Sequence, residues 1–176
     1  MAPDMTGGEM MGPAGAGRGA RVPYQAKVLT VSDSAMRGER EDESGPAVAR
    51  ALGEAGFEVV EQALTADGVA SVAGDLVRMA SGFAGLIVTT GGTGFGPRDQ
   101  TPEGTAEVIE RAAPGFGELM RRSGPLAPLS RGIVGVRGRA LVVNLPGSQK
   151  GAAESLAALL DLIPHALGLL AGERPH

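Results

Sequence analysis

Short strand-like runs alternate with helix-like segments along most of this chain, and this alternation limits its fold more than any other feature. Apolar runs rich in Val, Leu, Ile and Thr predict buried strands at residues 27–32, 57–60, 85–90 and 140–145. Apolar residues at helical spacing predict helices at residues 45–56, 69–81, 101–113, 116–122 and 150–171. Together they predict an α/β fold, a three-layer α/β/α sandwich with a mostly parallel, mixed sheet.

Local signals refine the ends of two predicted helices. Thr101 followed by Pro102 predicts an N-cap and a proline in the first turn. Pro164 predicts a kink inside the last helix. That helix carries more Leu, Ile and Ala than one sheet face needs, so we expect part of it to meet another subunit.

The length of 176 residues is about that of one domain. Residues 1–24 predict a disordered tail, because the first 20 residues hold six glycines and no periodic apolar pattern. We therefore expect one domain over residues 25–172.

Composition excludes several classes of protein and site. No run of 18 apolar residues occurs, so no membrane span is expected, and the net charge of −4 argues against a general nucleic-acid binder. The absence of cysteine removes disulfides and thiolate chemistry, and two histidines leave little for zinc or a Ser-His relay. A cysteine-free chain suits the cytoplasm, which is the location we expect.

A glycine-rich loop follows the strand predicted at residues 85–90. Four of the six residues from Gly91 to Gly96 are glycines, so backbone amides can approach an anion closely. The loop matches neither GxxxxGK[ST] nor GxGxxG, so neither a P-loop NTPase nor a classical dinucleotide fold is supported. We interpret it as a different kind of phosphate-binding loop; the alternative is a simple tight turn.

Three aspartates in predicted loops each have two interpretations. Asp99 suits a Mg²⁺ ligand beside bound phosphate, or a turn aspartate that bonds its own backbone. Asp67 could project into a ligand crevice at the end of a strand, or cap the helix at 69–81. Asp42 is a third candidate for a Mg²⁺ ligand, or part of a solvated loop, since it lies in a charge-rich stretch, residues 37–43.

Residues 121–139 hold five arginines and no Asp or Glu. They predict a local positive field for anionic small molecules, with scattered surface arginine as the alternative. Further on, Ser148 is a plausible N-cap, and Lys150 a plausible phosphate partner.

Several motifs occur in a fixed order across the predicted domain. They are Thr-Gly-Gly-Thr-Gly with Pro-Arg-Asp-x-Thr-Pro-Glu at 90–103, Leu-Ser-Arg at 129–131, Asn-Leu-Pro-Gly-Ser at 144–148, and Val-Ser-Asp at 31–33. At these motifs the chain resembles the molybdopterin adenylyltransferase family of molybdenum-cofactor biosynthesis. Each motif alone is weak, and the ordered set is specific.

The resemblance implies a homotrimer that binds Mg²⁺, ATP and molybdopterin and forms adenylyl-molybdopterin and pyrophosphate. It assigns Asp67 and Asp99 as catalytic and magnesium-associated, with Asp42 as a further acidic position of the metal site. The ligand-binding positions it implies are Thr90, Gly91, Gly92, Thr93, Gly94, Ser130, Arg131, Asn144, Pro146, Gly147 and Ser148. Transfer of the product to a molybdenum insertase is a further expectation.

The chain departs from the family pattern at three positions. Ser34 replaces a common Arg, Ala66 replaces a Pro before Asp67, and Gln149 replaces another Pro. The alternatives are a non-catalytic molybdopterin-binding protein of the same fold and an unrelated nucleotide-binding regulatory domain. Retention of both Asp67 and Asp99 favours catalysis.

Overall fold

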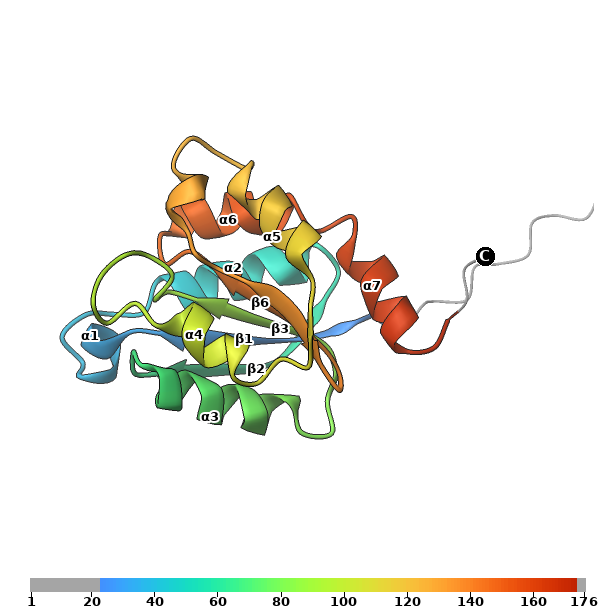
Figure 1. Cartoon of the computed structure of the whole chain (residues 1–176), viewed down its shortest axis with the longest axis horizontal. Coiled ribbons are helices and arrows are strands. Elements are labelled where there is room, and N and C mark those ends of the chain that lie inside the picture. The colour runs from blue at the N-terminus through green and yellow to red at the C-terminus, as the bar shows by residue number, and fades with distance from the viewer. Residues whose placement is uncertain (1–22, 174–176) are drawn as a thin grey trace, which may run out of the picture.

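The computed structural model describes residues 23–173, which form a sheet with helices on both faces (Figure 1). The six strands lie in the order β2-β1-β3-β6-β5-β4. They are β1 (Gln25–Val31), β2 (Glu58–Thr65), β3 (Ala84–Thr90), β4 (Arg111–Ala112), β5 (Val134–Arg137) and β6 (Arg139–Leu145). Nearly all of the predicted tail, residues 1–24, lies outside the described residues.

The helices are α1 (Asp33–Met36), α2 (Ser44–Glu54), α3 (Val69–Ala80), α4 (Thr101–Ala106), α5 (Pro114–Arg121), α6 (Gln149–Ala157) and α7 (Ile163–Leu170). A short 3₁₀ helix covers Ala127–Leu129. None of the helices between residues 23 and 173 combines the length and apolar content that a membrane crossing requires.

The sheet is mixed, as predicted. Strands β2, β1, β3 and β6 run parallel to one another, whereas β5 runs antiparallel to both β6 and β4. The parallel strands therefore end at one edge, where the loops that follow β1, β2, β3 and β6 come together.

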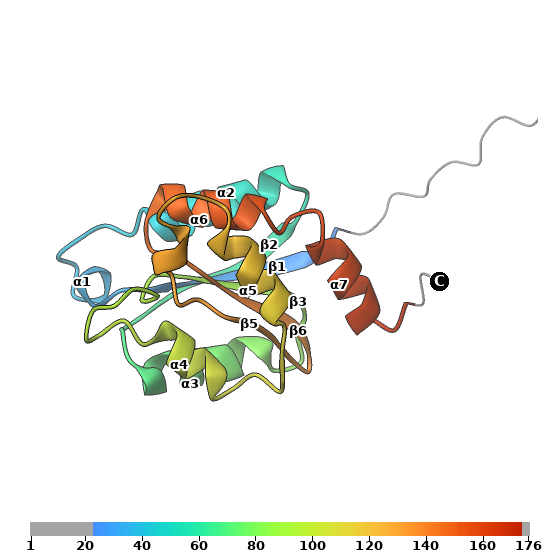
Figure 2. The same cartoon turned by 45° about the horizontal axis from the view of Figure 1, so that its top comes forward.

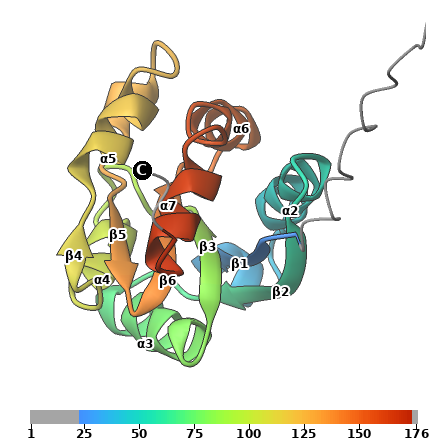
Figure 3. The same ribbon diagram turned by 90° about the vertical axis from the view of Figure 1, so that its right-hand side faces the viewer.

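Two apolar cores lie on opposite faces of the sheet. Helices α2, α5, α6 and α7 contribute to one core, and α3 packs on the other beside α4 (Figures 2 and 3). Strand β3 contributes to both cores, because Leu86 and Val88 pack in one and Ile87 packs in the other. This arrangement confirms the predicted three-layer α/β/α sandwich.

The helix predicted at 101–113 is wrong in its length and its cap. It ends at Ala106, and the chain then enters β4, which pairs with β5. Neither strand was predicted, because pairing across the chain overrides the helical spacing there. The N-cap position is Gln100, and the Thr101 hydroxyl instead donates to the Gly91 carbonyl at 2.9 Å.

The last predicted helix is broken rather than kinked. Helix α6 ends at Ala157 and α7 begins at Ile163, so Pro164 lies in the first turn of a new helix. Proline is tolerated there because a first-turn residue needs no N–H for the helix.

We predict that Leu76→Ala lowers the free energy of unfolding by about 3 kcal/mol, because Leu76 is fully buried in the core beneath α3. Val77 is the next residue of the same helix and is 41% exposed, so Val77→Ala is the matched control and should change stability by less than about 1 kcal/mol. Urea unfolding measures both variants. Equal losses would contradict the placement of the core.

Candidate functional site

A groove with two different halves lies at the carboxyl ends of the parallel strands. One half, of about 740 Å³, is lined mainly by polar side chains, including Ser32, Ser34, Arg40, Asp42, Ser44 and Asp67. The other, of about 440 Å³, has a wall formed by Pro125, Leu126, Ala127 and Leu129. Four residues line both halves and mark where they meet: Gly92, Asp99, Gly147 and Ser148.

The glycine-rich loop begins at this meeting point. Gly91 and Gly92 have φ angles of 102° and 63°, which favour glycine. A Cβ at Gly91 would lie 2.3 Å from the Val31 carbonyl oxygen, and one at Gly92 would lie 2.3 Å from Thr101 Oγ1. Both positions therefore require glycine for space as well as for conformation.

Three consecutive amides of this loop are available to a ligand. The backbone N–H groups of Gly92, Thr93 and Gly94 donate no hydrogen bond to any described residue. All three residues line the apolar half of the groove. Unpaired amides are suited to an anion such as phosphate, which supports the loop's predicted use.

Asp99 bonds its own turn and also lines both halves of the groove. Its Oδ2 accepts from the Gly96 N–H at 2.8 Å, and its own N–H donates to the Gly96 carbonyl at 3.0 Å. The turn-aspartate interpretation is thus confirmed. Its Oδ1 has no hydrogen-bond partner among residues 23–173, so this oxygen could bind a cation.

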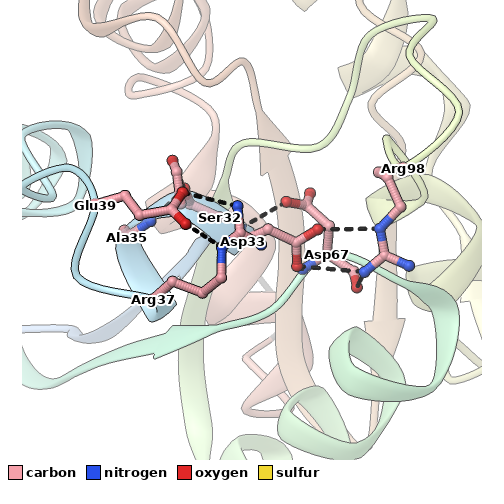
Figure 4. Close-up of polar contacts among 8 residues, drawn as sticks. Ser32, Asp33, Ala35, Arg37, Glu39, Asp67 and Arg98 are labelled. Atoms are coloured by element: carbon pink, nitrogen blue, oxygen red, sulfur yellow. Dashed lines mark hydrogen bonds and ion pairs between the residues drawn. The ribbon is translucent and has the colours of Figure 1, made fainter.

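Asp67 lies in the polar half and is tied to the loop after β1 (Figure 4). Its Oδ2 accepts from the Asp33 N–H at 2.8 Å, and its N–H donates to Asp33 Oδ1 at 3.0 Å. The alternative role as a helix cap is wrong, because α3 has Gly68 at its N-cap and no side-chain cap. Like Asp99, Asp67 keeps one carboxylate oxygen without a described partner.

Asp42 also lines the polar half, and like Asp67 and Asp99 it has one engaged carboxylate oxygen, Oδ1, and one without a hydrogen-bond partner among the described residues, so its predicted metal contact stays a prediction. Its Oδ1 accepts from the Gly45 N–H at 3.0 Å and from the Ser44 hydroxyl at 3.4 Å. Within residues 23–173, no three His, Cys, Asp or Glu side chains are grouped to hold a metal ion. Mg²⁺ usually takes one or two carboxylates together with phosphate oxygens and water, and Asp67 and Asp99 fit that requirement.

Arg131 clamps the glycine-rich loop. Its Nε donates to the Gly94 carbonyl at 2.7 Å, a terminal nitrogen donates to the Asp99 carbonyl, and its guanidinium pairs with Glu103. The hydrogen bonds from Arg131 hold the pKa of Glu103 below its ordinary value. All three guanidinium nitrogens are engaged, and Arg131 lines neither half of the groove, so its predicted ligand contact stays a prediction.

Thr90 and Asn144 are fully buried and also lie outside the groove lining. The Thr90 hydroxyl donates to the Pro146 carbonyl at 2.8 Å. The Asn144 amide donates to the hydroxyls of Thr89 and Thr105, and its oxygen accepts from the Ile133 N–H. Ligand contact at both residues stays a prediction, and their polar atoms connect β3, β6 and α4.

The turn after β6 reaches the groove as predicted. Pro146, Gly147 and Ser148 line it, and Ser148 is the N-cap of α6, accepting from the Gly151 N–H at 3.2 Å. Lys150 lines the apolar half with a side chain that is 84% exposed, and it pairs with Glu154 of the same half at 3.8 Å. Ser130 lines the same half and donates to the Thr93 hydroxyl at 3.1 Å.

Other parts of the groove differ from expectation. None of the five arginines in residues 121–139 lines it, and Arg40 contributes a positive charge instead. The wall around Leu126 was missed, because its apolar residues follow no periodic pattern. Only the structure identifies this wall, because it shows that Leu126 is 73% exposed and Leu129 57% exposed.

Comparison with known proteins agrees with the motifs. The chain matches the family model described as "Probable molybdopterin binding domain" over residues 27–165. A curated molybdopterin adenylyltransferase of Helicobacter pylori (strain J99) is 40% identical over 152 residues, covering 82% of this chain and 86% of the relative. A molybdenum cofactor biosynthesis bifunctional protein of Synechococcus elongatus is 35% identical over 158 residues, covering 88% of this chain and 50% of the relative.

A solved structure resembles the whole described domain. The molybdopterin biosynthesis enzyme MoaB from Thermus thermophilus superposes with a TM-score of 0.79 at 47% sequence identity. The match covers 85% of this chain and 98% of that one. The fold is therefore shared.

We predict that Gly92→Ala destabilises the protein by at least about 1 kcal/mol more than Gly38→Ala. Gly38 also has a positive φ, of 71°, but open space around it, whereas a Cβ at Gly92 meets Thr101 Oγ1 at 2.3 Å. Because both glycines have a positive φ, the difference between the two variants measures the cost of crowding apart from that of backbone strain. Urea unfolding measures it, and equal losses would argue against close packing at Gly92.

We predict that Glu103→Gln lowers the free energy of unfolding by less than about 1 kcal/mol at neutral pH, and that this loss disappears in acid. Because Arg131 lowers the pKa of folded Glu103 below 4.5, ionisation stabilises the protein fully above that pH. The stabilisation is lost as the pH falls through the folded pKa. Unfolding curves at about pH 7 and about pH 3.5 test this, and a difference independent of pH would contradict it.

Proposed function

Because the chain belongs to the family of the probable molybdopterin binding domain, we propose that it is a molybdopterin adenylyltransferase of molybdenum-cofactor biosynthesis. The observation that carries this proposal in the structure is the meeting of two unlike half-grooves at Gly92, Asp99, Gly147 and Ser148. A reaction between phosphates of two substrates needs two adjoining binding spaces and a shared anion site where they touch.

The proposed reaction needs no nucleophile from the protein. An oxygen of the molybdopterin phosphate attacks the α-phosphorus of ATP, the bond from that phosphorus to the oxygen bridging to the β-phosphorus breaks, and pyrophosphate leaves. The work of the protein is to hold the phosphates in line and to balance their charge. This suits a site built from amides, carboxylates and a few cations, with no cysteine in the chain.

Each part of the groove has a role in this proposal. The free amides of Gly92, Thr93 and Gly94 donate to phosphate oxygens, and Lys150 and Arg40 add positive charge at either half. Asp67 and Asp99 are the residues that would hold Mg²⁺, since each has a carboxylate oxygen without a described partner. When bound, Mg²⁺ supplies charge neutralisation at the phosphates.

The proposal extends to assembly and location. We propose a homotrimer that works in the cytoplasm and passes its product to a molybdenum insertase. Exposed leucines on the C-terminal segment, Leu162 at 44% and Leu169 at 52%, support contact with another subunit. The bifunctional Synechococcus relative supports the connection to a second activity, since this chain matches half of that protein.

We predict that Asp67→Asn and Asp99→Asn each lower kcat at least about 100-fold, because each removes a carboxylate from the proposed ion site. Release of pyrophosphate from ATP, Mg²⁺ and molybdopterin measures the rate. Asp161→Asn is the control, since Asp161 is exposed and lies outside the groove.

Two outcomes would contradict the proposal at different levels. Normal rates in both variants would remove the roles given to Asp67 and Asp99. Binding of molybdopterin by the unmodified protein without pyrophosphate release would make it a binding protein instead of an enzyme.

A further inference from the structure

One arginine outside the groove is bonded to the loops that carry Asp33 and Asp67 (Figure 4). Arg98 Nε donates to Asp33 Oδ2 at 3.0 Å, and a terminal nitrogen reaches Asp33 Oδ1 at 3.3 Å. The same terminal nitrogen donates to the main-chain carbonyl of Asp67 at 2.7 Å. Arg98 therefore contacts Asp67 both directly and through Asp33.

Asp33 and Asp67 are joined to each other in both directions. Each residue donates its backbone N–H to the other's carboxylate, at 2.8 and 3.0 Å. Because Asp33 follows β1 and Asp67 follows β2, these bonds fix the ends of two neighbouring strands relative to each other. The Asp67 carboxylate is held through Oδ2, which leaves Oδ1 as the oxygen available to the groove.

Arg98 is placed to hold this pair, and its third guanidinium nitrogen, Nη1, has no hydrogen-bond partner among the described residues. Arg98 lines neither half, and two of its three guanidinium nitrogens are engaged by Asp33 and Asp67. A planar guanidinium bound at two points fixes its partners more firmly than a single ammonium would.

We infer that Arg98, acting with Asp33, is a positioning residue for the Asp67 carboxylate in the adenylyl transfer. The inference rests on the proposed function and adds to it a residue outside the groove that sets the rate of the reaction. Loss of Arg98 removes the bonds to the Asp33 carboxylate and to the Asp67 carbonyl together, and leaves the two bonds between Asp33 and Asp67 without that support. The Asp67 carboxylate is then held less firmly, although the groove keeps every residue that lines it.

Arg37 provides a matched control in the segment that follows β1. Its side chain also makes a two-point ion pair with a carboxylate, to Glu39, at 2.7 and 2.9 Å. The guanidinium has no hydrogen bond to Asp33 or Asp67 (Figure 4), and Arg37 lines neither half of the groove. Arg37→Ala thus removes the same kind of interaction without releasing Asp67.

The first experiment measures kcat and KM for ATP by pyrophosphate release. We expect Arg98→Ala to lower kcat about 10- to 100-fold with KM changed less than about threefold, because a misplaced group slows the step more than binding. Arg98→Lys should recover part of kcat, and Arg37→Ala should match the unmodified protein. A rise in KM for ATP with kcat unchanged would overturn the inference, since it would indicate direct contact with a phosphate.

The second experiment combines Arg98→Ala with Asp67→Asn. If Arg98 acts through Asp67, the double variant should be no slower than Asp67→Asn alone. Rate losses that multiply would overturn the inference. If the unmodified protein releases no pyrophosphate, the proposed function fails, and the contacts among Arg98, Asp33 and Asp67 are then tested without turnover.

The third experiment is hydrogen exchange of the full chain. Arg98→Ala should speed exchange of the Asp33 and Asp67 amides at least about tenfold, because each amide donates to the other residue's carboxylate beside Arg98. Exchange in β3 should stay unchanged, which separates a local release from general unfolding. Unchanged exchange at Asp33 and Asp67 would overturn the inference whatever the activity.

Discussion

The groove depends on how closely the backbone at Gly91 approaches the loops beside it. A Cβ on Gly91 would collide with the Val31 carbonyl at the end of β1, and a Cβ on Gly147 would lie 3.2 Å from the Gly91 Cα. The ends of β1, β3 and β6 therefore pack together with no side chain between them. The buried Thr101 hydroxyl holds the Gly91 carbonyl, which fixes the start of the loop whose next three amides remain unpaired among the described residues.

Charged groups around the groove serve mainly to hold its loops. Arg131 clamps the glycine-rich loop and pairs with Glu103, while Arg98 ties the loops after β1 and β2 through Asp33. Hydrogen bonds from Arg98 also hold the pKa of Asp33 below its ordinary value. Few basic side chains are left to face the groove, so in the proposed function the phosphates are bound largely by backbone amides.

Sequence patterns predicted the parts of the fold that are set by local preference. The runs at 85–90 and 140–145 became β3 and β6 almost to the residue, because buried parallel strands are continuous apolar runs. Strands β4 and β5 were missed, since their short segments are strands only through pairing with each other and with β6. The proline at 164 marked a true boundary, although the chain separates two helices there.

The site was predictable in its location but less so in its detail. Glycines and aspartates at strand ends identified Gly92, Asp67 and Asp99, all of which line the groove. The sequence does not show which polar side chains face the groove. Asn144 and Arg131 form hydrogen bonds with other residues of the protein instead. Their contacts join residues that are far apart in the chain and leave no local pattern.

Arg98 and Asp99 are neighbours in the chain, yet they serve different carboxylate positions. One binds the loop that carries Asp67, and the other presents its own carboxylate to the groove. A single peptide unit therefore links the residue that contacts Asp67 to the second acidic position. An insertion or deletion at this point would shift one acid against the other, so the spacing within Pro-Arg-Asp is expected to tolerate substitutions of side chains far better than changes of length.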